Sequence, residues 1–147
     1  MSGNKNKIKV LFLCTGNSCR SQIAEGWAKH LKSDVIDAYS AGIRPIGVSA
    51  RAIKVMAEAG VDISNHKSKH MDEFRGIDFD YVVTLCDNAE SCPVFSGKVK
   101  IVHKSFEDPH FAAGSEEAVL KTFRKVRDQI KAFVEKMPGN LRRAGAK

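Results

Sequence analysis

The sequence predicts an α/β fold: a single domain of three layers, in which a four-stranded parallel sheet is flanked by helices. Short apolar runs alternate with longer amphipathic segments along the chain, which is the order found in parallel α/β proteins. A length of 147 residues suits one domain with a substantial core. No repeat or low-complexity segment divides the chain, so we assign residues 1–137 to the domain and residues 138–147 to a basic C-terminal tail.

Four apolar runs are predicted to be strands: residues 8–13, 35–41, 81–85 and 98–103. The first is broken only by Lys9, as expected for a central strand that is buried on both faces. The second run ends at Gly42, and the third is apolar or β-branched throughout. In the fourth run Val99 and Ile101 share one face, because side chains alternate along a strand.

The predicted helices cover residues 18–32, 49–59 and 115–137, with one or two helical turns at 71–75. Ser49 is a suitable N-cap for the second helix, and Gly60 is a suitable stop. Ser115, followed by two glutamates, begins the last helix, and Pro138 ends it. Apolar residues at helical spacing mark the core face of this last helix: Val119, Phe123, Val126, Ile130, Phe133 and Val134.

Three chemically active side chains come directly after predicted strands or in the loops that follow them: Cys14, Cys86 and Asp108. The carboxyl ends of parallel strands meet at one edge of a sheet, and ligands bind there in α/β proteins. Pro109 keeps the preceding Asp108 extended in its loop. The sequence therefore predicts a functional site at this edge.

The loop after the first strand predicts a site for a tetrahedral oxyanion. The helix N-terminus and Arg20 favour the thiolate of Cys14, and Ser21 can donate a hydrogen bond to its sulfur. Arg20 can hold two oxygens of an anion, and Gly16 can take a positive φ. The loop amides form an anion nest, so we expect substrate contacts from the whole loop: Thr15, Gly16, Asn17, Ser18, Cys19, Arg20 and Ser21.

The net charge of +7 does not predict nucleic-acid binding. Basic residues are spread along the chain, and their only cluster, in residues 141–147, has no aromatic residues between its charges. We interpret the charge as a solvated basic face that also attracts a dianion. No apolar run is long enough for a membrane span, and residues 1–9 lack the apolar part of a signal peptide. We therefore expect a cytoplasmic protein that binds neither nucleic acid nor membranes. We also expect it to be a monomer.

The four cysteines fit catalytic or redox roles better than structural disulfides in the reducing cytoplasm. Five residues separate Cys86 from Cys92, whereas the paired cysteines of a zinc site are usually separated by about two to four residues. No metal is therefore predicted. If the bound anion is arsenate, its reduction to arsenite takes two electrons, and one disulfide supplies them. Cys14 would be the first sulfur and Cys86 the second, and Cys92 would move the disulfide outward. Two unrelated thiols in a loop are the alternative interpretation.

These residues resemble those of the thioredoxin-coupled arsenate reductases, which are built on the low-molecular-weight tyrosine phosphatase fold. The similarity covers nearly the whole domain. It rests on the loop at residues 14–22 and on four further segments: residues 39–42, 62–66, 83–86 and 108–109. The resemblance implies that the predicted sheet and helices are arranged as in the low-molecular-weight tyrosine phosphatases.

The resemblance also implies a role for each candidate residue. Arsenate binds the loop and Arg20, the Cys14 thiolate attacks arsenic, and Asp108 protonates the departing oxygen as general acid. Cys86 then expels arsenite from Cys14, and Cys92 attacks Cys86 in turn. Reduced thioredoxin is the expected external electron donor, and no bound cofactor is expected.

One position departs from the family pattern in a way that concerns metal binding. Some members bind a structural potassium ion near Asn17, Glu25 and Ser40. Lys69 stands in this chain where a further acidic ligand is expected. Its ammonium can replace the ion, so we predict that no metal is required.

Two other functions stay open. A low-molecular-weight phosphatase would use the same Cys14, Arg20 and Asp108 on phosphotyrosine or a small phosphoester. Phosphatases of this fold generally follow their Asp-Pro pair with an aromatic residue, but here His110 comes first and Phe111 second. A non-enzymatic oxyanion-binding or redox-sensing module would bind phosphate at Cys14 without turnover.

Overall fold

The computed structural model describes residues 7–85 and 99–145, with side chains up to residue 142. Cys86 and Cys92 lie outside the described residues. Within these ranges the elements follow one another as β1 (Ile8–Cys14), α1 (Arg20–Leu31), β2 (Ile36–Gly42), α2 (Ala50–Glu58), η2 (Met71–Phe74), β3 (Tyr81–Thr84), β4 (Lys100–His103), η4 (Pro109–Phe111), α3 (Glu116–Glu135) and α4 (Gly139–Gly145). The α elements are α-helices, and the η elements are short 3₁₀-helices.

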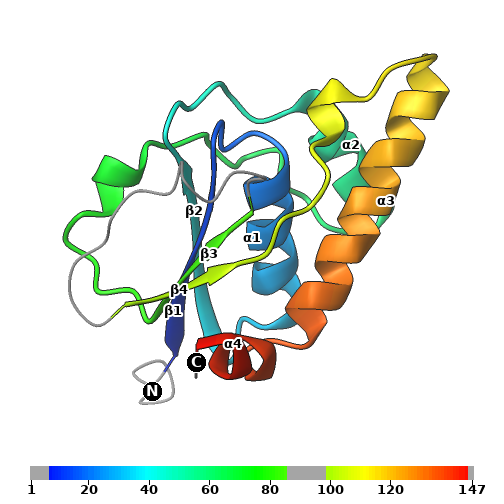
Figure 1. The fold of residues 1–147 in the computed structure, drawn as a ribbon. Helices are drawn as coiled ribbons and strands as arrows, with labels where there is room; N and C mark the ends of the chain where they lie inside the picture. The colour runs from blue at the N-terminus through cyan, green and yellow to red at the C-terminus, as the bar shows by residue number, and fades with distance from the viewer. Residues whose placement is uncertain (1–6, 86–98, 146–147) are drawn as a thin grey trace.

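The four strands form one parallel sheet in the order β2-β1-β3-β4 (Figure 1). β1 lies inside the sheet, where Val10 pairs with Ala38 of β2 on one side and with Tyr81 of β3 on the other. The chain leaves β1 toward β2 and later returns past it to β3, so a crevice is expected at the carboxyl ends of β1 and β3. The predicted parallel α/β sheet is confirmed, and so is the central position of its first strand.

The helices α1, α2 and α3 lie on one face of this sheet (Figure 1). They pack into the larger core, to which β1 contributes Val10, Phe12 and Cys14. Leu11 and Leu13 point to the opposite face and belong to a second, smaller core. Because side chains alternate, β1 supplies both cores, which explains its unbroken apolar sequence.

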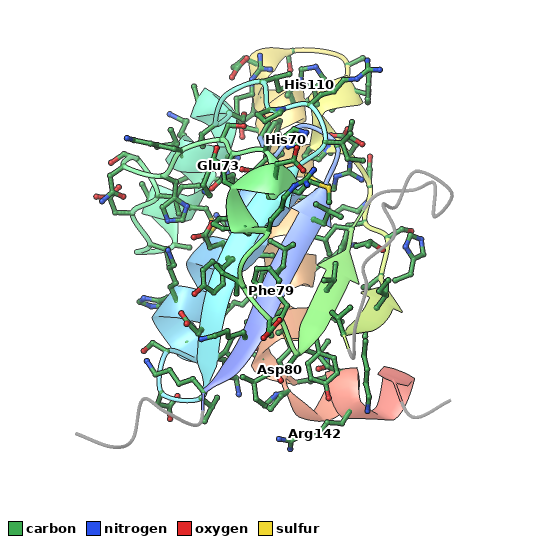
Figure 2. The ribbon with its side chains drawn as sticks, turned by 90° about the vertical axis from the view of Figure 1, so that its left-hand side faces the viewer. His70, Glu73, Phe79, Asp80, His110 and Arg142 are labelled. Atoms are coloured by element: carbon green, nitrogen blue, oxygen red, sulfur yellow. The ribbon has the colours of Figure 1, made fainter. Side chains whose placement is uncertain are left out.

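The cover of the second face is thinner. Figure 2 shows η2 lying over this face, with Phe79 beneath it against the sheet. The rings of Tyr39, Phe74 and Phe79 pack edge to face, with centroids 5.2, 5.2 and 6.2 Å apart. On this face Val99 packs against the smaller core, but Ile101 of β4 is 46% exposed.

The predicted helix ends are confirmed at the caps. The Ser49 hydroxyl accepts a hydrogen bond from the Ala52 amide at 3.3 Å at the start of α2. Ser115 caps α3 in the same way, accepting from the Ala118 amide at 3.1 Å. Gly60 follows α2 with a φ of +86°, as a glycine stop requires. None of the helices in the described part of the chain is long and apolar enough to cross a membrane.

Helix α1 is buried more completely than the predicted amphipathic pattern implies. Every residue from position 20 to position 28 is buried. Trp27 packs in the larger core, and its indole N–H donates to the Arg127 carbonyl of α3 at 3.1 Å. The polar residues Ser21, Gln22 and Glu25 are buried as well. Since buried polar groups need partners, this helix indicates a polar network inside the protein.

The last helix differs from the predicted basic tail. α4 packs against β4, and Leu141 is fully buried in the larger core. The segment from residue 138 therefore packs on the domain at least as far as Leu141. Pro138 and Gly139 follow the end of α3, but the chain continues into the core because Leu141 is apolar.

Gly42, at the end of β2, is where the sheet meets the loop after β1. A Cβ at this position would lie 2.7 Å from the Thr15 oxygen, 2.8 Å from the Asn17 nitrogen and 3.0 Å from the Cys14 oxygen. All three are backbone atoms, which cannot move aside as the end of a flexible side chain can. Only glycine allows β2 to approach the loop this closely.

We predict that Gly42→Ala destabilises the protein by about 1–3 kcal/mol, because the added methyl group overpacks a rigid backbone contact. Gly76→Ala is the matched control, since a Cβ there meets nothing within 4 Å. Urea unfolding of both variants checks this. A Gly42→Ala protein as stable as Gly76→Ala would show that the loop yields without cost.

Candidate functional site

The Cys14 loop, which we define as residues 14–21, joins the end of β1 to the start of α1. Cys14 is the last residue of the strand and Arg20 the first of the helix, and both are buried. The predicted convergence of a thiol, a short loop and a guanidinium at a helix N-terminus is therefore present in the fold.

The loop carbonyl oxygens accept hydrogen bonds from residues outside the loop. The donors, at 2.9 to 3.1 Å, are the Ser68 hydroxyl and four backbone amides, those of Ile43, Arg44, Ile46 and Ser49. The accepting oxygens belong to Thr15, Gly16, Asn17 and Ser18. In a planar trans peptide the next N–H points opposite to the carbonyl, so these peptide units direct their N–H groups toward the loop interior. Such a ring of amides can hold a tetrahedral oxyanion.

Asn17 shapes the loop from within. Its φ is +47°, a left-handed conformation that asparagine tolerates better than most residues, and the residue is fully buried. Its side-chain N–H₂ group donates to the hydroxyls of Ser21 at 2.8 Å and Ser40 at 3.0 Å. Its side-chain oxygen accepts from Gln22 at 2.9 Å and from the Lys69 amide at 2.8 Å. The Asn17 side chain thus uses all its hydrogen-bonding positions.

Ser21 connects this asparagine to the nucleophile. The Ser21 Oγ lies 3.0 Å from the Cys14 Sγ. Because Ser21 already accepts a hydrogen bond from Asn17, its own hydrogen can point at the sulfur. This is the contact that the sequence predicts between Ser21 and Cys14.

Cys19, the second cysteine of the loop, has different surroundings. Burial raises the pKa of its thiol to about 11, although hydrogen bonds with Ser49 and Ser18 oppose the increase. The charges of Asp108 and Cys14 raise it further. Cys19 is therefore a neutral thiol at physiological pH, and its part in the loop is that of its backbone.

Arg20 contacts the segments that follow β3 and β4, including Asp108. Its Nη1 donates to the carbonyl of Leu85, just after β3, at 3.1 Å and to that of Phe106, after β4, at 3.0 Å. Its Nη2 lies 3.3 Å from the Asp108 carboxylate. Asp108 also caps η4 by accepting from the His110 amide at 3.0 Å. These contacts place the predicted general acid beside the Cys14 loop.

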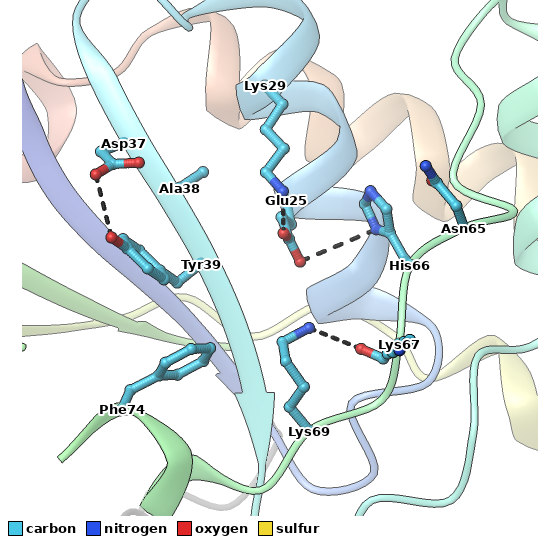
Figure 3. A pocket seen from close by; sticks show the side chains of 10 residues that line it. All are labelled: Glu25, Lys29, Asp37, Ala38, Tyr39, Asn65, His66, Lys67, Lys69 and Phe74. Carbon is cyan, nitrogen blue, oxygen red and sulfur yellow. Dashed lines mark hydrogen bonds and ion pairs between the residues drawn. The ribbon is translucent and has the colours of Figure 1, made fainter. Parts of the chain in front are cut away.

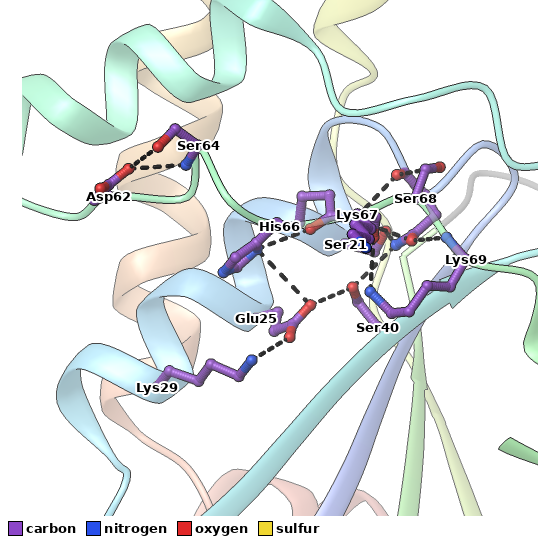
Figure 4. Close-up of polar contacts among 12 residues, drawn as sticks. Ser21, Glu25, Lys29, Ser40, Asp62, Ser64, His66, Lys67, Ser68 and Lys69 are labelled. Atoms are coloured by element: carbon purple, nitrogen blue, oxygen red, sulfur yellow. Dashed lines mark hydrogen bonds and ion pairs between the residues drawn. The ribbon is translucent and has the colours of Figure 1, made fainter. Parts of the chain in front are cut away.

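A second layer of contacts supports the loop from outside (Figure 4). The Gln22 amide nitrogen donates to the carbonyls of Asn17 and Lys67 as well as to the Asn17 side chain, at 2.9 to 3.2 Å. The amide oxygen of Gln22 therefore faces His66, whose Nδ1 lies 2.9 Å away and must be the donor. His66 thus anchors its own segment to Gln22 of α1.

Beside α1 and β2 lies a cavity of about 650 Å³ (Figure 3). The Glu25 carboxylate, 5% exposed, accepts from the Ser40 hydroxyl at 2.5 Å and pairs with the Lys29 ammonium at 2.6 Å. His66 Nδ1 lies 3.9 Å from it, and Lys69 also lines the cavity. Burial lowers the pKa values of both His66 and Lys69, while the charge of Glu25 opposes both decreases.

These residues do not fit a bound cation. The oxygens of Asn17 and Glu25 accept from protein donors, and Lys29 and Lys69 bring two ammonium groups into the same cavity. A potassium ion there would meet like charges. Elsewhere in residues 7–85 and 99–142, no cluster of three or more His, Cys, Asp or Glu side chains is arranged to hold a metal ion.

The structure thus brings together Cys14 and Arg20, from one loop, with Asp108, which is 88 residues further along the chain than Arg20. The roles predicted for Cys86 and Cys92 stay predictions, because both residues lie outside the described part. The supporting residues received no role from the sequence: Gln22, His66 and Ser68. Their partners are up to 52 residues away, so no local spacing could have indicated them.

We predict that His66 makes the protein less stable in mild acid. Its folded pKa is lowered below 6.5, so the unfolded chain binds more protons just below this pH, and the free energy of unfolding falls as the pH decreases through that window. His66→Gln should reduce this pH slope in urea titrations between pH 7.5 and 5.5. The exposed His30, changed to Gln, is the control, and equal slopes in all three proteins would contradict the prediction.

Similar proteins share this architecture. The low molecular weight phosphotyrosine protein phosphatase family matches residues 9–147. An arsenate reductase of Bacillus subtilis (strain 168) is 50% identical over 127 residues, which are 86% of this chain and 91% of that protein. A solved structure, "An arsenate reductase in the phosphate binding state", has a TM-score of 0.75 at 34% identity and covers 90% of this chain and 98% of its own. A low molecular weight protein tyrosine phosphatase from T. tengcongensis has a TM-score of 0.68 at 25% identity, covering 91% and 99%. The chain therefore belongs to the low molecular weight phosphotyrosine protein phosphatase family, and within this family of enzymes it groups with the arsenate reductases.

Proposed function

We propose that this protein reduces arsenate to arsenite and thereby detoxifies arsenic. The observation that carries the proposal is the Cys14 loop, in which the Cys14 sulfur lies 3.0 Å from the Ser21 hydroxyl and the outward carbonyls leave the loop amides directed inward. The arsenate reductase of Bacillus subtilis, at 50% identity, supports arsenate as the oxyanion. Two further cysteines, Cys86 and Cys92, supply the thiols that a reduction requires.

The first step is the formation of a sulfur–arsenic bond. Arsenate binds the loop amides and Arg20, and the Cys14 thiolate attacks arsenic in line with the departing oxygen. Asp108 gives its proton to that oxygen, which leaves as water. The 3.3 Å contact between Arg20 and Asp108 supports this assignment, because it holds the carboxyl group beside the group that binds the anion.

The second step moves two electrons. The Cys86 thiolate attacks the sulfur of Cys14, a disulfide forms, and arsenic keeps the electron pair of the broken bond and leaves as arsenite. Cys92 then attacks Cys86 and frees Cys14. A reduced dithiol protein, which we propose to be thioredoxin, then reduces the Cys86–Cys92 disulfide and is itself oxidised to a disulfide. In this proposal the protein works as a cytoplasmic monomer without a bound cofactor or metal.

A phosphatase is the second candidate, since a low molecular weight protein tyrosine phosphatase has the same fold. Phosphoryl transfer through Cys14 needs Arg20 and Asp108 but no second thiol, because phosphorus is not reduced. The exposed Phe111, next to the loop that carries Asp108, could contact an aromatic phosphoester. Loss of Cys86 separates the two functions.

We expect arsenate-dependent oxidation of NADPH, in the presence of thioredoxin and thioredoxin reductase, for the wild type and none for Cys86→Ser. Cys92→Ser should complete one turnover and accumulate the Cys14–Cys86 disulfide, which peptide mapping by mass spectrometry detects. Cys19→Ser is the matched control, since its thiol has no part in the relay. No arsenate reduction, together with equal hydrolysis of an aryl phosphate by the wild type and Cys86→Ser, would identify a phosphatase.

Asp108→Asn tests the general acid. We predict a loss of about 10²–10⁴-fold in the single-turnover rate of adduct formation, because the amide cannot supply the proton. The apparent affinity for arsenate should change much less, since the loop amides and Arg20 remain. Near-normal turnover of Asp108→Asn would remove Asp108 from the mechanism.

A further inference from the structure

Lys69 lies where three parts of the site meet. Its backbone amide donates to the Asn17 side chain at 2.8 Å, and its carbonyl accepts from the Gly42 amide at 2.8 Å. Its ammonium turns back to donate to the Lys67 carbonyl at 2.7 Å (Figure 3). One residue therefore connects the Cys14 loop, the end of β2 and the cavity that contains Glu25.

The Lys69 side chain is held inward at a cost. Lysine side chains usually extend their charge into water, but this one is half-buried in the cavity wall. Burial lowers its pKa, and the nearby Lys29 lowers it further, while Glu25 acts in the opposite direction. A charged group kept in such a place indicates a role other than solubility.

A continuous chain of buried hydrogen bonds leads from Glu25 to the nucleophile. The Ser40 hydroxyl donates to Glu25 and accepts from Asn17. Asn17 donates with its other hydrogen to Ser21, which contacts Cys14. The Glu25 carboxylate therefore fixes which way the Ser40 hydrogen points, and through Asn17 it supports the conformation of the loop.

Positive charge reaches Glu25 from two sides. Lys29 pairs with one carboxylate oxygen, but the Lys29 side chain is 53% exposed and is screened by solvent. Lys69 approaches from the segment that holds Asn17, next to Ser40, and is better shielded (Figure 4). The two lysines are thus unequal, and Lys69 is the one tied to the loop.

We propose that Lys69 is a positioning residue whose ammonium serves as a built-in monovalent cation beside Glu25 and so holds the Cys14 loop in its anion-binding form. These residues do not fit a potassium site because the positive charge that such an ion would supply already belongs to a side chain of the protein, that of Lys69. The loop of the wild-type protein then needs no cation from solution. The inference rests on the proposed function only in that the loop binds an oxyanion.

Removal of the ammonium should create a cation site. Lys69→Ala removes the ammonium beside the Lys67 carbonyl in the cavity that Glu25 also lines, while Lys29 stays paired with one carboxylate oxygen of Glu25. Potassium or a small alkylammonium ion has the charge and size to take the vacant place. Rescue by such an ion is a response that a purely structural defect does not show.

The experiment is calorimetric titration of inorganic phosphate into the wild type, Lys69→Ala and Lys67→Ala, in choline, sodium, potassium or ethylammonium chloride at equal ionic strength. Lys67 is the matched control, because it lines the same cavity and its side chain is exposed. We expect the wild type and Lys67→Ala to bind phosphate equally in all four salts. Lys69→Ala should bind at least about fivefold more weakly in choline chloride and recover in potassium or ethylammonium chloride.

Two results would overturn the proposal: unchanged phosphate binding by Lys69→Ala in choline chloride, or an equal loss in every salt. Lys69→Met, which keeps the length of the side chain and loses only its charge, replaces the alanine variant if that variant is unfolded. Phosphate binding involves no electron transfer. A wild-type protein that binds phosphate but does not reduce arsenate would therefore refute the proposed function and leave the Lys69 test intact.

Discussion

The hydrogen bonds that turn the carbonyl oxygens of the Cys14 loop outward are the constraint on which the rest of the site depends. A buried carbonyl without a partner costs about 1–3 kcal/mol, so each oxygen needs a donor from outside the loop. Four backbone amides of the segment after β2 and the Ser68 hydroxyl supply these donors, and the parallel pairing of β1 with β2 brings that segment within reach. The same pairing leaves no space for a side chain at Gly42. The ability of the loop to bind an anion therefore depends on the register in which β1 pairs with β2.

Burial of polar groups follows from this constraint. Asn17 takes a left-handed conformation that reverses the chain, and its side chain then occupies the space behind the loop, out of water. Every hydrogen-bonding position of that side chain is used, so hydrogen bonds within the protein compensate for the water that the buried amide loses. The first turns of α1 have to be buried on all sides to close this space. Ser21 and Gln22 are polar although they are buried, because they are the hydrogen-bond partners of Asn17.

Local signals predicted most of the fold because local physics determines those features. The cap at Ser49, the stop at Gly60 and the apolar run of β1 each depend on a few neighbouring residues, and each is confirmed. The convergence of Cys14 and Asp108 followed from the rule that parallel strands end at one edge. In contrast, the packing of Leu141 depends on a core built by the whole chain, and the bond between Gln22 and His66 joins residues 44 apart. Sequence spacing contains no information about such contacts.

Charge balance explains why a loop for anions has a buried acid behind it. Three hydrogen-bonded residues connect the Glu25 carboxylate to Cys14. The negative charge of Glu25 would therefore disfavour both a thiolate and a bound dianion if no cation offset it. Lys29 and Lys69 provide that offset on the outer side, while Arg20 and the inward amides act on the inner side. With the charge neutralised, Glu25 can anchor Ser40 and orient the Asn17 amide without weakening the site. In the proposed arrangement, the lysines behind the loop are thus as necessary for oxyanion binding as the buried Arg20.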